Sequence, residues 1–407
     1  MKVIEGGIVS ARGFRATGTA AGIKYQGRKD MAMIVSDSPC VLAGVFTSNV
    51  VKAAPVLWDM KVLRQSDYAQ AVVVNAGIAN ACTGKQGEES CRETASEAAS
   101  LLGIPEDSVL IGSTGVIGMP LDMEKIKNGI RAMVPELGNA AENGKIAAES
   151  IMTTDTIPKQ VAVQVEIKGK TVTIGGMAKG SGMIHPDMGT MLAYVTTDAA
   201  IKKELLQNML ERDVKDTFNM VSVDGDTSTN DTLLVLANGM AGNEIMDGED
   251  EESRKFFDAL HYVNENLAKM IAGDGEGATK LLEIRVTGAA NTEDAKKLAK
   301  SVTGSSLTKA AMYGNDANFG RILCALGYSG VQFNPDQIDF YFEAEGKRMM
   351  ICRNGQAADY NEEEASALLA HEKVVIDIYL KEGQGSAVAW GCDLTYDYVK
   401  INADYRS

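Results

Sequence analysis

The sequence contains few histidines and no paired cysteines, which limits the chemistry available to it. Its three histidines, His185, His261 and His371, lie far apart among 407 residues. The six cysteines include no Cys-x-x-Cys pair and no cysteine at zinc-type spacing from a histidine. A histidine-dependent mechanism and a zinc site are therefore disfavoured, and we expect buried or free thiols in a reducing compartment.

The chain also lacks long apolar runs and an excess of basic residues. No stretch reaches the roughly 18 consecutive apolar residues of a membrane span, and Met1–Gly7 has no apolar segment of the signal-peptide type. A formal net charge of −15 argues against a nucleic-acid partner, because such a partner requires a basic surface. With 45% hydrophobic residues, the chain can bury a large core. We therefore expect a cytoplasmic globular enzyme of two or three folding units, with no membrane partner.

A glycine-rich loop meets a buried strand in the middle of the sequence. Residues 179–189 hold three glycines, a proline and a lysine, whereas Met191–Val195 is apolar, and Thr190 stands at the border. A hydroxyl there, next to Gly189, is well placed to attack its own preceding peptide bond. The cut would free an α-amine on Thr190, which can serve as the base for the hydroxyl of the same residue. The alternative is an ordinary threonine at the end of a loop.

A second glycine cluster follows another predicted strand. Gly112–Gly118 has the spacing G-x-x-G-x-x-G, which differs from the G-x-G-x-x-G of dinucleotide-binding loops. An oxyanion hole is the better interpretation, because glycine lets a backbone N–H approach a developing oxyanion while a neighbouring hydroxyl donates a second bond. A plain strand-turn glycine cluster is the alternative.

The acidic stretch Ser222–Thr232 invites comparison with a calcium-binding loop. The comparison fails, because the sixth loop position is Thr229 instead of glycine and the twelfth is Val235 instead of glutamate. No metal site is therefore expected from this segment.

Several blocks of this sequence resemble the ornithine acetyltransferase family, also called glutamate N-acetyltransferase, of the cyclic arginine pathway, and the resemblance covers the whole length. It is carried by Lys179–Ile184, Thr190–Leu192, Thr196–Ala199, Ser222–Thr232 and Gly314–Ile322. The sequence departs from the family at His185–Gly189, where many members have alanine-proline-asparagine-methionine-alanine, and at Phe319, where tryptophan is usual.

This resemblance implies a self-cleaving enzyme with Thr190 as its nucleophile. Cleavage between Gly189 and Thr190 would give an α piece (1–189) and a β piece (190–407), and the family forms assemblies of two α and two β pieces. The matching oxyanion-hole residues are Thr114 and Gly115. The matching substrate-binding residues are Thr153, Lys179, Thr190, Glu276, Asn402 and Ser407. On the residues alone, Lys179 could instead be a solvated loop lysine, and the C-terminal tail a frayed end.

The reaction implied by the resemblance is ping-pong transfer of acetyl from N²-acetyl-L-ornithine to L-glutamate through acetyl-threonine, with no metal and no bound cofactor. The sequence does not decide whether acetyl-CoA is also accepted as an acetyl donor, which would add N-acetylglutamate synthesis. We expect Glu276 to pair with the substrate's ammonium group and Lys179 with a carboxylate. Two alternatives remain: a self-processing amidase or aminopeptidase, in which water is the acceptor, and a silent binding protein, against which the intact site residues argue.

The predicted fold class is α+β. The resemblance implies a layered α/β sandwich of the aminopeptidase/ornithine-acetyltransferase type, with a catalytic region at 1–281 and a C-terminal α/β domain at 282–407 whose tail returns to the active site. Local patterns predict strands at Met31–Val35 and Val41–Thr47, helices at Glu88–Leu102 and Asp122–Val134, a hairpin over Gln160–Ile174, and a helix capped by Asp198.

Overall fold

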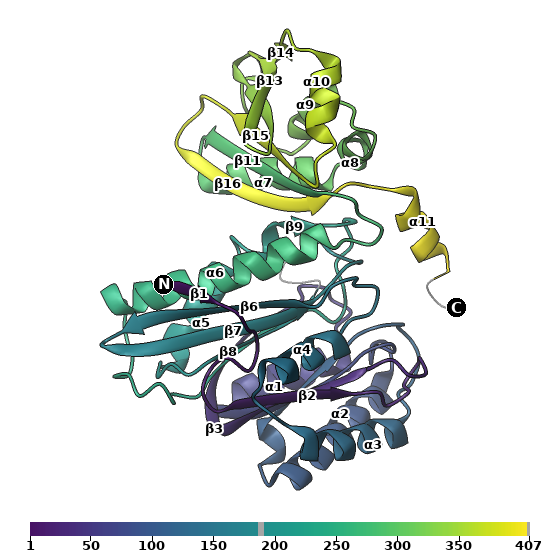
Figure 1. Cartoon of the computed structure of the whole chain (residues 1–407), viewed down its shortest axis with the longest axis vertical. Coiled ribbons are helices and arrows are strands. Elements are labelled where there is room, and N and C mark those ends of the chain that lie inside the picture. Colours follow the sequence, from purple (N-terminus) through teal and green to yellow (C-terminus); the bar gives the residue numbers. More distant parts are fainter. Residues whose placement is uncertain (186–190, 405–407) are drawn as a thin grey trace. The chain divides into compact units, whose positions relative to one another are not determined.

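A computed structural model describes residues 1–185 and 191–404 of the chain. Gly189, Thr190 and Ser407, which the sequence assigns to the site, lie outside the described residues. The chain forms two compact units (Figure 1). The first contains residues 1–180, 186–218 and 227–267, and the second contains 181–185, 219–226 and 268–407. The boundary predicted after residue 281 falls inside a strand of the second unit.

The first unit is built on a nine-stranded sheet with the order β1-β6-β7-β8-β10-β3-β4-β5, and β2 pairs with β3 outside this path. Its strands are β1 (Lys2–Ile4), β2 (Phe14–Thr19), β3 (Met31–Phe46), β4 (Tyr68–Asn75), β5 (Val109–Ser113), β6 (Lys159–Ile167), β7 (Lys170–Lys179), β8 (Leu192–Thr197) and β10 (Thr232–Ala237). The predicted hairpin is confirmed as β6 and β7. The two strands predicted near residue 40 are one continuous strand, β3, which shifts register on β4 between Val35 and Cys40.

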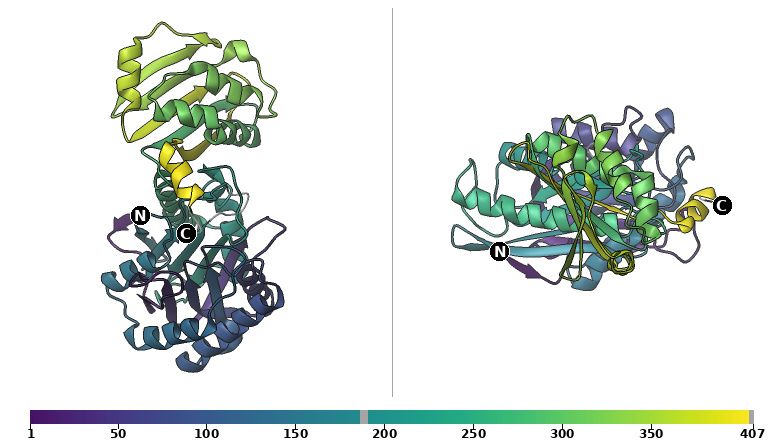
Figure 2. Two further views of the ribbon diagram at one scale, coloured as in Figure 1. Left: turned by 90° about the vertical axis from the view of Figure 1, so that its right-hand side faces the viewer. Right: turned by 90° about the horizontal axis from the view of Figure 1, so that it is seen from above.

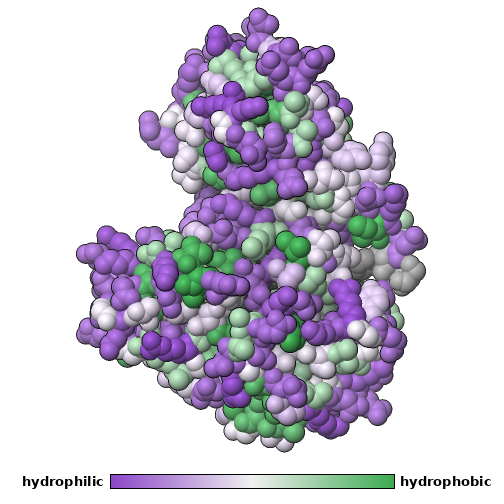
Figure 3. Space-filling model, in the orientation of Figure 1, coloured by the Kyte–Doolittle hydropathy of each residue, from purple (hydrophilic) through white to green (hydrophobic). Residues whose placement is uncertain are grey.

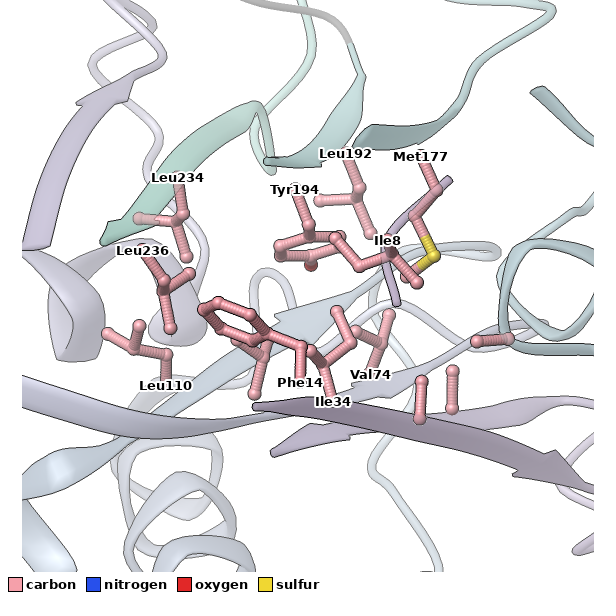
Figure 4. Packing of buried hydrophobic residues seen from close by; sticks show 14 of the residues in the cluster. Ile8, Phe14, Ile34, Val74, Leu110, Met177, Leu192, Tyr194, Leu234 and Leu236 are labelled. Atoms are coloured by element: carbon pink, nitrogen blue, oxygen red, sulfur yellow. The ribbon is translucent and has the colours of Figure 1, made fainter. Parts of the chain in front are cut away.

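The core of the first unit lies between two layers of this sheet. Leu192 and Tyr194 of β8 belong to the same buried cluster as Val74 of β4 and Leu110 of β5. In Figure 4, Tyr194 and Leu192 project from one layer toward Phe14, Ile34 and Val74 on the other. This stacking brings β8, which begins just after Thr190, over the strands that lead to the predicted oxyanion hole.

Helices cover the outer faces of these layers, except for α4 (Ala141–Ser150), whose residues Ala147 and Ala148 belong to the core cluster between them (Figure 1, Figure 2). The helices are α1 (Ala54–Gln65), α2 (Gly84–Leu102), α3 (Met123–Met133), α4, α5 (Lys203–Asp213) and α6 (Glu251–Gly273), whose last turns belong to the second unit. Short 3-10 turns lie at Glu106–Ser108, Val134–Glu136, Phe218–Met220 and Pro335–Gln337. The predicted helix over Asp122–Val134 is confirmed as α3, and Asp122 caps it, because its side chain accepts hydrogen bonds from the N–H groups of Glu124 and Lys125.

The prediction that Asp198 caps the next helix is wrong. That helix, α5, begins at Lys203 and has no side-chain cap. Asp198 instead accepts hydrogen bonds from the backbone N–H groups of Thr173, at 2.7 Å, and Arg12, at 3.3 Å. The chain forms a bridge at Ile201 before it turns into the helix, so the cap position falls later than the sequence suggests.

The second unit contains a seven-stranded sheet with the order β14-β13-β12-β15-β11-β16-β9 and helices packed against it (Figure 2). Its strands are β9 (Val221–Ser222), β11 (Leu281–Ala289), β12 (Asp339–Ala344), β13 (Lys347–Arg353), β14 (Gln356–Ala357), β15 (Lys373–Tyr379) and β16 (Gly385–Cys392). Its helices are α7 (Thr292–Gly304), α8 (Ser306–Tyr313), α9 (Phe319–Gly327), α10 (Glu362–Leu369) and α11 (Tyr396–Ala403). The predicted α+β class is confirmed.

One face of the molecule and its helices and cysteines can be compared with the sequence expectations. The face seen in Figure 3 is mostly hydrophilic, with its apolar residues in separate patches. Over the described residues, no helix is both long and apolar enough to cross a membrane. All six cysteines are free thiols.

Candidate active site

Three strand ends of the first unit meet where the chain resumes after Thr190. Lys179, the last residue of β7, pairs with Leu192 at the start of β8, and Leu192 pairs with Thr232 at the start of β10. The Thr232 N–H donates to the carbonyl of Met191 at 3.0 Å. The residue that follows Thr190 is therefore fixed at the same sheet edge as Lys179.

Asn230 connects this edge to the end of β5. Its side-chain amide donates to the carbonyl of Ser113 at 2.8 Å, and the residue is buried. The Thr232 hydroxyl in turn donates to the Asn230 carbonyl at 3.0 Å. The last part of the acidic segment Ser222–Thr232 thus joins the start of β8 to the residue that precedes Thr114.

The backbone at Thr114 and Gly115 is held in an uncommon conformation. The Thr114 N–H donates to the Asn75 carbonyl at 3.0 Å, and Gly115 has a φ of +127°. A Cβ at Gly115 would overlap the backbone of Gly77, so only glycine fits there. Both residues are half-buried. Among the described residues, neither the Thr114 hydroxyl nor the Gly115 N–H has a hydrogen-bond partner, so both donors are available to an oxyanion.

A buried carboxylate, Asp155, lies at the centre of the predicted substrate residues of this unit. Its Oδ1 accepts from the Lys159 ammonium at 2.8 Å and from the Gly180 N–H at 2.7 Å. Its Oδ2 accepts from the Thr153 N–H at 3.0 Å and forms an ion pair with the Lys179 ammonium at 3.7 Å. Burial alone would raise the pKa of Asp155, but the charges of Lys179 and Lys159, with hydrogen bonds, hold it well below its usual range.

Lys179 is almost completely buried, with 7% of its surface exposed. Apart from the ion pair with Asp155, its ammonium group has no partner among the described residues. A buried ammonium group without a hydrogen-bond acceptor is costly unless an anion binds it. The solvated-loop alternative for Lys179 is thereby excluded, and its surroundings suit a carboxylate ligand.

In the second unit, two of the predicted substrate residues, Glu276 and Asn402, lie together. The Asn402 side-chain amide donates to Glu276 Oε2 at 2.7 Å, although the two residues are far apart in sequence. Glu276 is buried, and its N–H donates to the Ser181 carbonyl at 2.9 Å. A Cβ on Gly182 would overlap the Glu276 carboxylate, so the glycine gives that side chain its space.

Asp224 joins three segments of the second unit. Its carboxylate accepts from the N–H groups of Met183, at 2.6 Å, and Ile184, at 2.8 Å. It also accepts from the Tyr398 hydroxyl of α11 at 3.2 Å. Burial and the neighbouring Asp224 raise the pKa of Tyr398, so this hydroxyl remains a donor. The segment before the predicted cleavage point and the C-terminal helix are thus held by one side chain.

Asp155 and Asp224 are the residues that sequence reasoning missed. Asp155 lies in the polar cluster after Thr153, four residues before Lys159, and this i,i+4 charge pair is a signal that could have indicated it. Asp224 falls in a segment whose metal-binding interpretation failed. Within the described residues, no group of His, Cys, Asp and Glu side chains could hold a metal ion.

Two free donors at a strand end, joined to the strand that follows a candidate nucleophile, are compatible with an enzyme of the acyltransferase class, and the comparisons with known proteins show this class. The chain belongs to the ArgJ family, whose model matches residues 15–407. This confirms the resemblance inferred from the sequence blocks.

The relatives are similar to this chain over its full length. The arginine biosynthesis bifunctional protein ArgJ of Symbiobacterium thermophilum is 52% identical over 410 residues and covers 100% of both chains. That of Thermotoga neapolitana is 48% identical over 397 residues, covering 97% of this chain and 99% of its own.

Among solved structures, the Bacillus halodurans ArgJ is 48% identical, covers 52% of this chain and 97% of its own, and has a TM-score of 0.50. Ornithine acetyltransferase of Mycobacterium tuberculosis, complexed with ornithine, is 41% identical, covers 47% of this chain and 99% of its own, and has a TM-score of 0.43.

Proposed function

We propose that this protein transfers the acetyl group of N²-acetyl-L-ornithine to L-glutamate. The observation that carries the proposal is the pair of unengaged donors at Thr114 and Gly115, which Asn230 connects to the strand that begins after Thr190. Donors aimed at a developing oxyanion are what acyl transfer requires. Membership of the ArgJ family, and the ornithine bound to the similar Mycobacterium tuberculosis enzyme, support the substrate class.

Activation begins with self-cleavage. The Thr190 hydroxyl attacks the Gly189 carbonyl, the peptide bond breaks, and hydrolysis of the resulting ester leaves Thr190 as a new N-terminus. The products are an α piece (1–189) and a β piece (190–407), assembled as two of each. The departures from the family at His185, Asp187 and Gly189 precede the cut, and the sequence keeps the family's threonine at position 190.

Transfer then proceeds in two halves. The Thr190 hydroxyl attacks the acetyl carbonyl of N²-acetylornithine while its own amine takes the proton, and Thr114 and Gly115 stabilise the tetrahedral oxyanion. The C–N bond breaks, the proton passes to the leaving amine, and ornithine departs. The amine of glutamate attacks the acetyl-threonine ester in the same way and regenerates Thr190. No metal or bound cofactor takes part.

The substrate contacts divide by charge. Lys179, whose ammonium group has no acceptor apart from Asp155 among the described residues, receives a carboxylate. Glu276, which Asn402 orients, receives the ammonium group of the ornithine moiety. Thr153 and Ser407 complete the set of substrate contacts.

The test is the denatured intact mass of the purified protein, before and after brief exposure to N²-acetylornithine without acceptor. We expect two fragments split at Gly189/Thr190, with the β piece gaining one acetyl group. Thr190→Ala is the control and should stay a single, unlabelled chain. A wild-type chain that remains uncut and unlabelled would contradict the proposal.

Acceptor dependence separates transfer from hydrolysis. With L-glutamate the acetyl label should leave as N-acetylglutamate, whereas release as acetate at the same rate without glutamate would favour an amidase. Replacing the donor with acetyl-CoA tests whether the same protein also makes N-acetylglutamate from that donor.

A further inference from the structure

The C-terminal helix of the second unit, α11, contacts the loop that carries Glu276. None of its eight residues, Tyr396–Ala403, is buried, and in Figure 1 it lies apart from the seven-stranded sheet of that unit. So short a helix is marginal in water, because its own hydrogen bonds do not offset the cost of ordering the chain. Its position therefore depends on the contacts of particular side chains.

The first turn of α11 contacts Gly277, the residue after Glu276. The Thr395 hydroxyl donates to the Gly277 carbonyl at 2.8 Å and accepts from the Tyr398 N–H at 3.3 Å. A Cβ on Gly277 would overlap the Tyr398 nitrogen, so the two backbones are in direct contact. The start of the helix and the Glu276 loop are thus joined.

Asn402 joins the helix to this loop again, one turn after Tyr398. Its side-chain amide donates to the Tyr398 carbonyl at 3.0 Å and to Glu276 Oε2 at 2.7 Å. Both hydrogens of the amide are therefore engaged. The direction in which Asn402 meets Glu276 depends on where the Tyr398 backbone lies.

The Tyr398 side chain is held at its other end. Its hydroxyl donates to Asp224 Oδ2 at 3.2 Å. The N–H groups of Met183 and Ile184 fix that carboxylate in turn. Burial, and then the carboxylates of Asp224 and Glu276, raise the pKa of Tyr398, so the hydroxyl keeps its proton and remains a donor. Asp224 thus provides a fixed attachment for the middle of α11.

We propose that Tyr398 is a positioning residue for the acetyl donor: its hydrogen bond to Asp224 fixes α11, so that Asn402 holds the Glu276 carboxylate where the ammonium group of N²-acetylornithine binds. This rests on the proposed function, in which Glu276 receives that ammonium group. Tyr398 acts on Glu276 through Asn402.

The proposal makes Tyr398 important for only one of the two substrates. N²-acetylornithine has a side-chain ammonium group, whereas L-glutamate has a carboxylate there. Tyr398→Phe removes the hydroxyl and keeps the ring, so α11 loses its attachment to Asp224 while the packing of the ring stays. A less well positioned Glu276 then weakens recognition of the donor and leaves that of the acceptor unchanged.

The experiment measures kcat/KM for each substrate on fully cleaved protein, since in ping-pong kinetics each value reports one half-reaction. In Tyr398→Phe, kcat/KM for N²-acetylornithine should fall about fivefold, and that for L-glutamate should stay within about twofold of the wild type. Tyr396→Phe is the matched control, because it removes the hydroxyl of an exposed tyrosine in the same helix. It should behave as wild type.

A double-mutant cycle tests the route through Asn402. In the Asn402→Ala background, Tyr398→Phe should change kcat/KM for N²-acetylornithine by less than about twofold, because the link to Glu276 is already broken. Additive losses, an equal loss for both substrates, or no loss in Tyr398→Phe would each overturn the inference.

Binding of free amino acids separates this inference from the proposed function. In Tyr398→Phe, the calorimetric Kd of L-ornithine should rise about fivefold, while that of L-norvaline, which lacks the side-chain ammonium group, should not change. If the wild type transfers no acetyl group, the proposed function fails, and these two Kd values still decide the inference. A wild type that does not bind L-ornithine overturns the inference as well.

Discussion

At the scale of single residues, the space above Gly182 decides where the Glu276 carboxylate lies. A Cβ there would overlap that carboxylate and push it away from Asn402, its hydrogen-bond partner. Gly182→Ala should therefore raise the KM for N²-acetylornithine by about tenfold, with a smaller change in kcat, because a displaced contact weakens binding first. Steady-state kinetics on fully cleaved protein measures this.

Gly304→Ala is the matched control for this substitution. A Cβ at Gly304 would meet no atom within 4 Å, so the variant should behave as wild type. Equal KM values for Gly182→Ala and Gly304→Ala would show that the position of Glu276 does not depend on Gly182.

Single residues also show where sequence reasoning stops. The position of Thr114 and Gly115 after a strand could be predicted, because a glycine cluster after a strand has a local pattern and a matching family block, whereas their oxyanion role stays a prediction. Asp155 and Asp224 could not, because their roles depend on partners distant in sequence: Lys179 for the first, Met183 and Ile184 for the second. No local periodicity records such contacts.

At the scale of elements, the segment Ser181–His185 leads toward the predicted cleavage point and is held by Ser222–Asp224. The N–H groups of Met183 and Ile184 donate to Asp224, the Ile184 carbonyl accepts from the Val223 N–H at 2.6 Å, and His185 lies 2.9 Å from the Ser222 hydroxyl. Met183 has a φ of +57°, a strained conformation for a residue other than glycine. The chain is therefore held up to His185, four residues before the predicted cut.

Asp224→Asn should slow self-cleavage. The amide oxygen of asparagine can still accept a hydrogen bond from one of the N–H groups of Met183 and Ile184, but the amide nitrogen is itself a donor and repels the other N–H group. We expect the full-length chain to be cleaved into the α and β pieces at least about tenfold more slowly than in the wild type. The measurement is the fraction of full-length chain on denaturing gels over time after synthesis. Asp226→Asn, two residues on in the same loop, is the control; identical time courses for the two variants would contradict the role of Asp224.

The helices and strands that could be predicted are those whose ends are set by residues next to them in the sequence. Asp122 caps α3 because the helix begins at the next residue, and β6 and β7 follow an alternating pattern around a turn. The prediction that Asp198 caps a helix failed because Ile201 pairs with Met246, so that the helix begins later in the sequence. The two predicted strands form one continuous strand, β3, because its two halves pair with different strands, β4 and β10. Tertiary contacts, not propensity, set those boundaries.

At the scale of the whole molecule, stability should depend on pH through the His261–Asp213 pair that links α6 to α5. The His261 ring lies 2.7 Å from the buried Asp213, whose hydrogen bond raises the pKa of His261 above its ordinary 6.5. A raised folded-state pKa gives a stabilising contribution that is complete below the unfolded value and lost as pH rises through the folded value. His261→Gln should therefore lower Tm relative to wild type most at acidic pH.

Thermal unfolding of both proteins between about pH 5.5 and pH 9 measures this difference. The gap in Tm should narrow toward the alkaline end, and His371→Gln, which changes a histidine outside the pair, should show no such trend. A gap that stays constant across the range would show that the charge of His261 contributes nothing.

The last prediction concerns how a cut chain stays in one piece. Cleavage at Gly189 would place β7 in the α piece and β8 in the β piece, yet these strands are paired from Lys179↔Leu192 to Ile174↔Thr197. The β10–β3 ladder, from Thr232↔Phe46 to Ala237↔Val41, also joins the two pieces. Because both ladders lie inside the buried sheet, separating the pieces would expose the core. The cleaved protein should therefore give two bands under denaturing conditions, one species in native mass spectrometry, and a Tm within a few degrees of uncut Thr190→Ala. Pieces that separate on a sizing column without denaturant would mean that the intact peptide bond, and not the shared sheet, holds the first unit together.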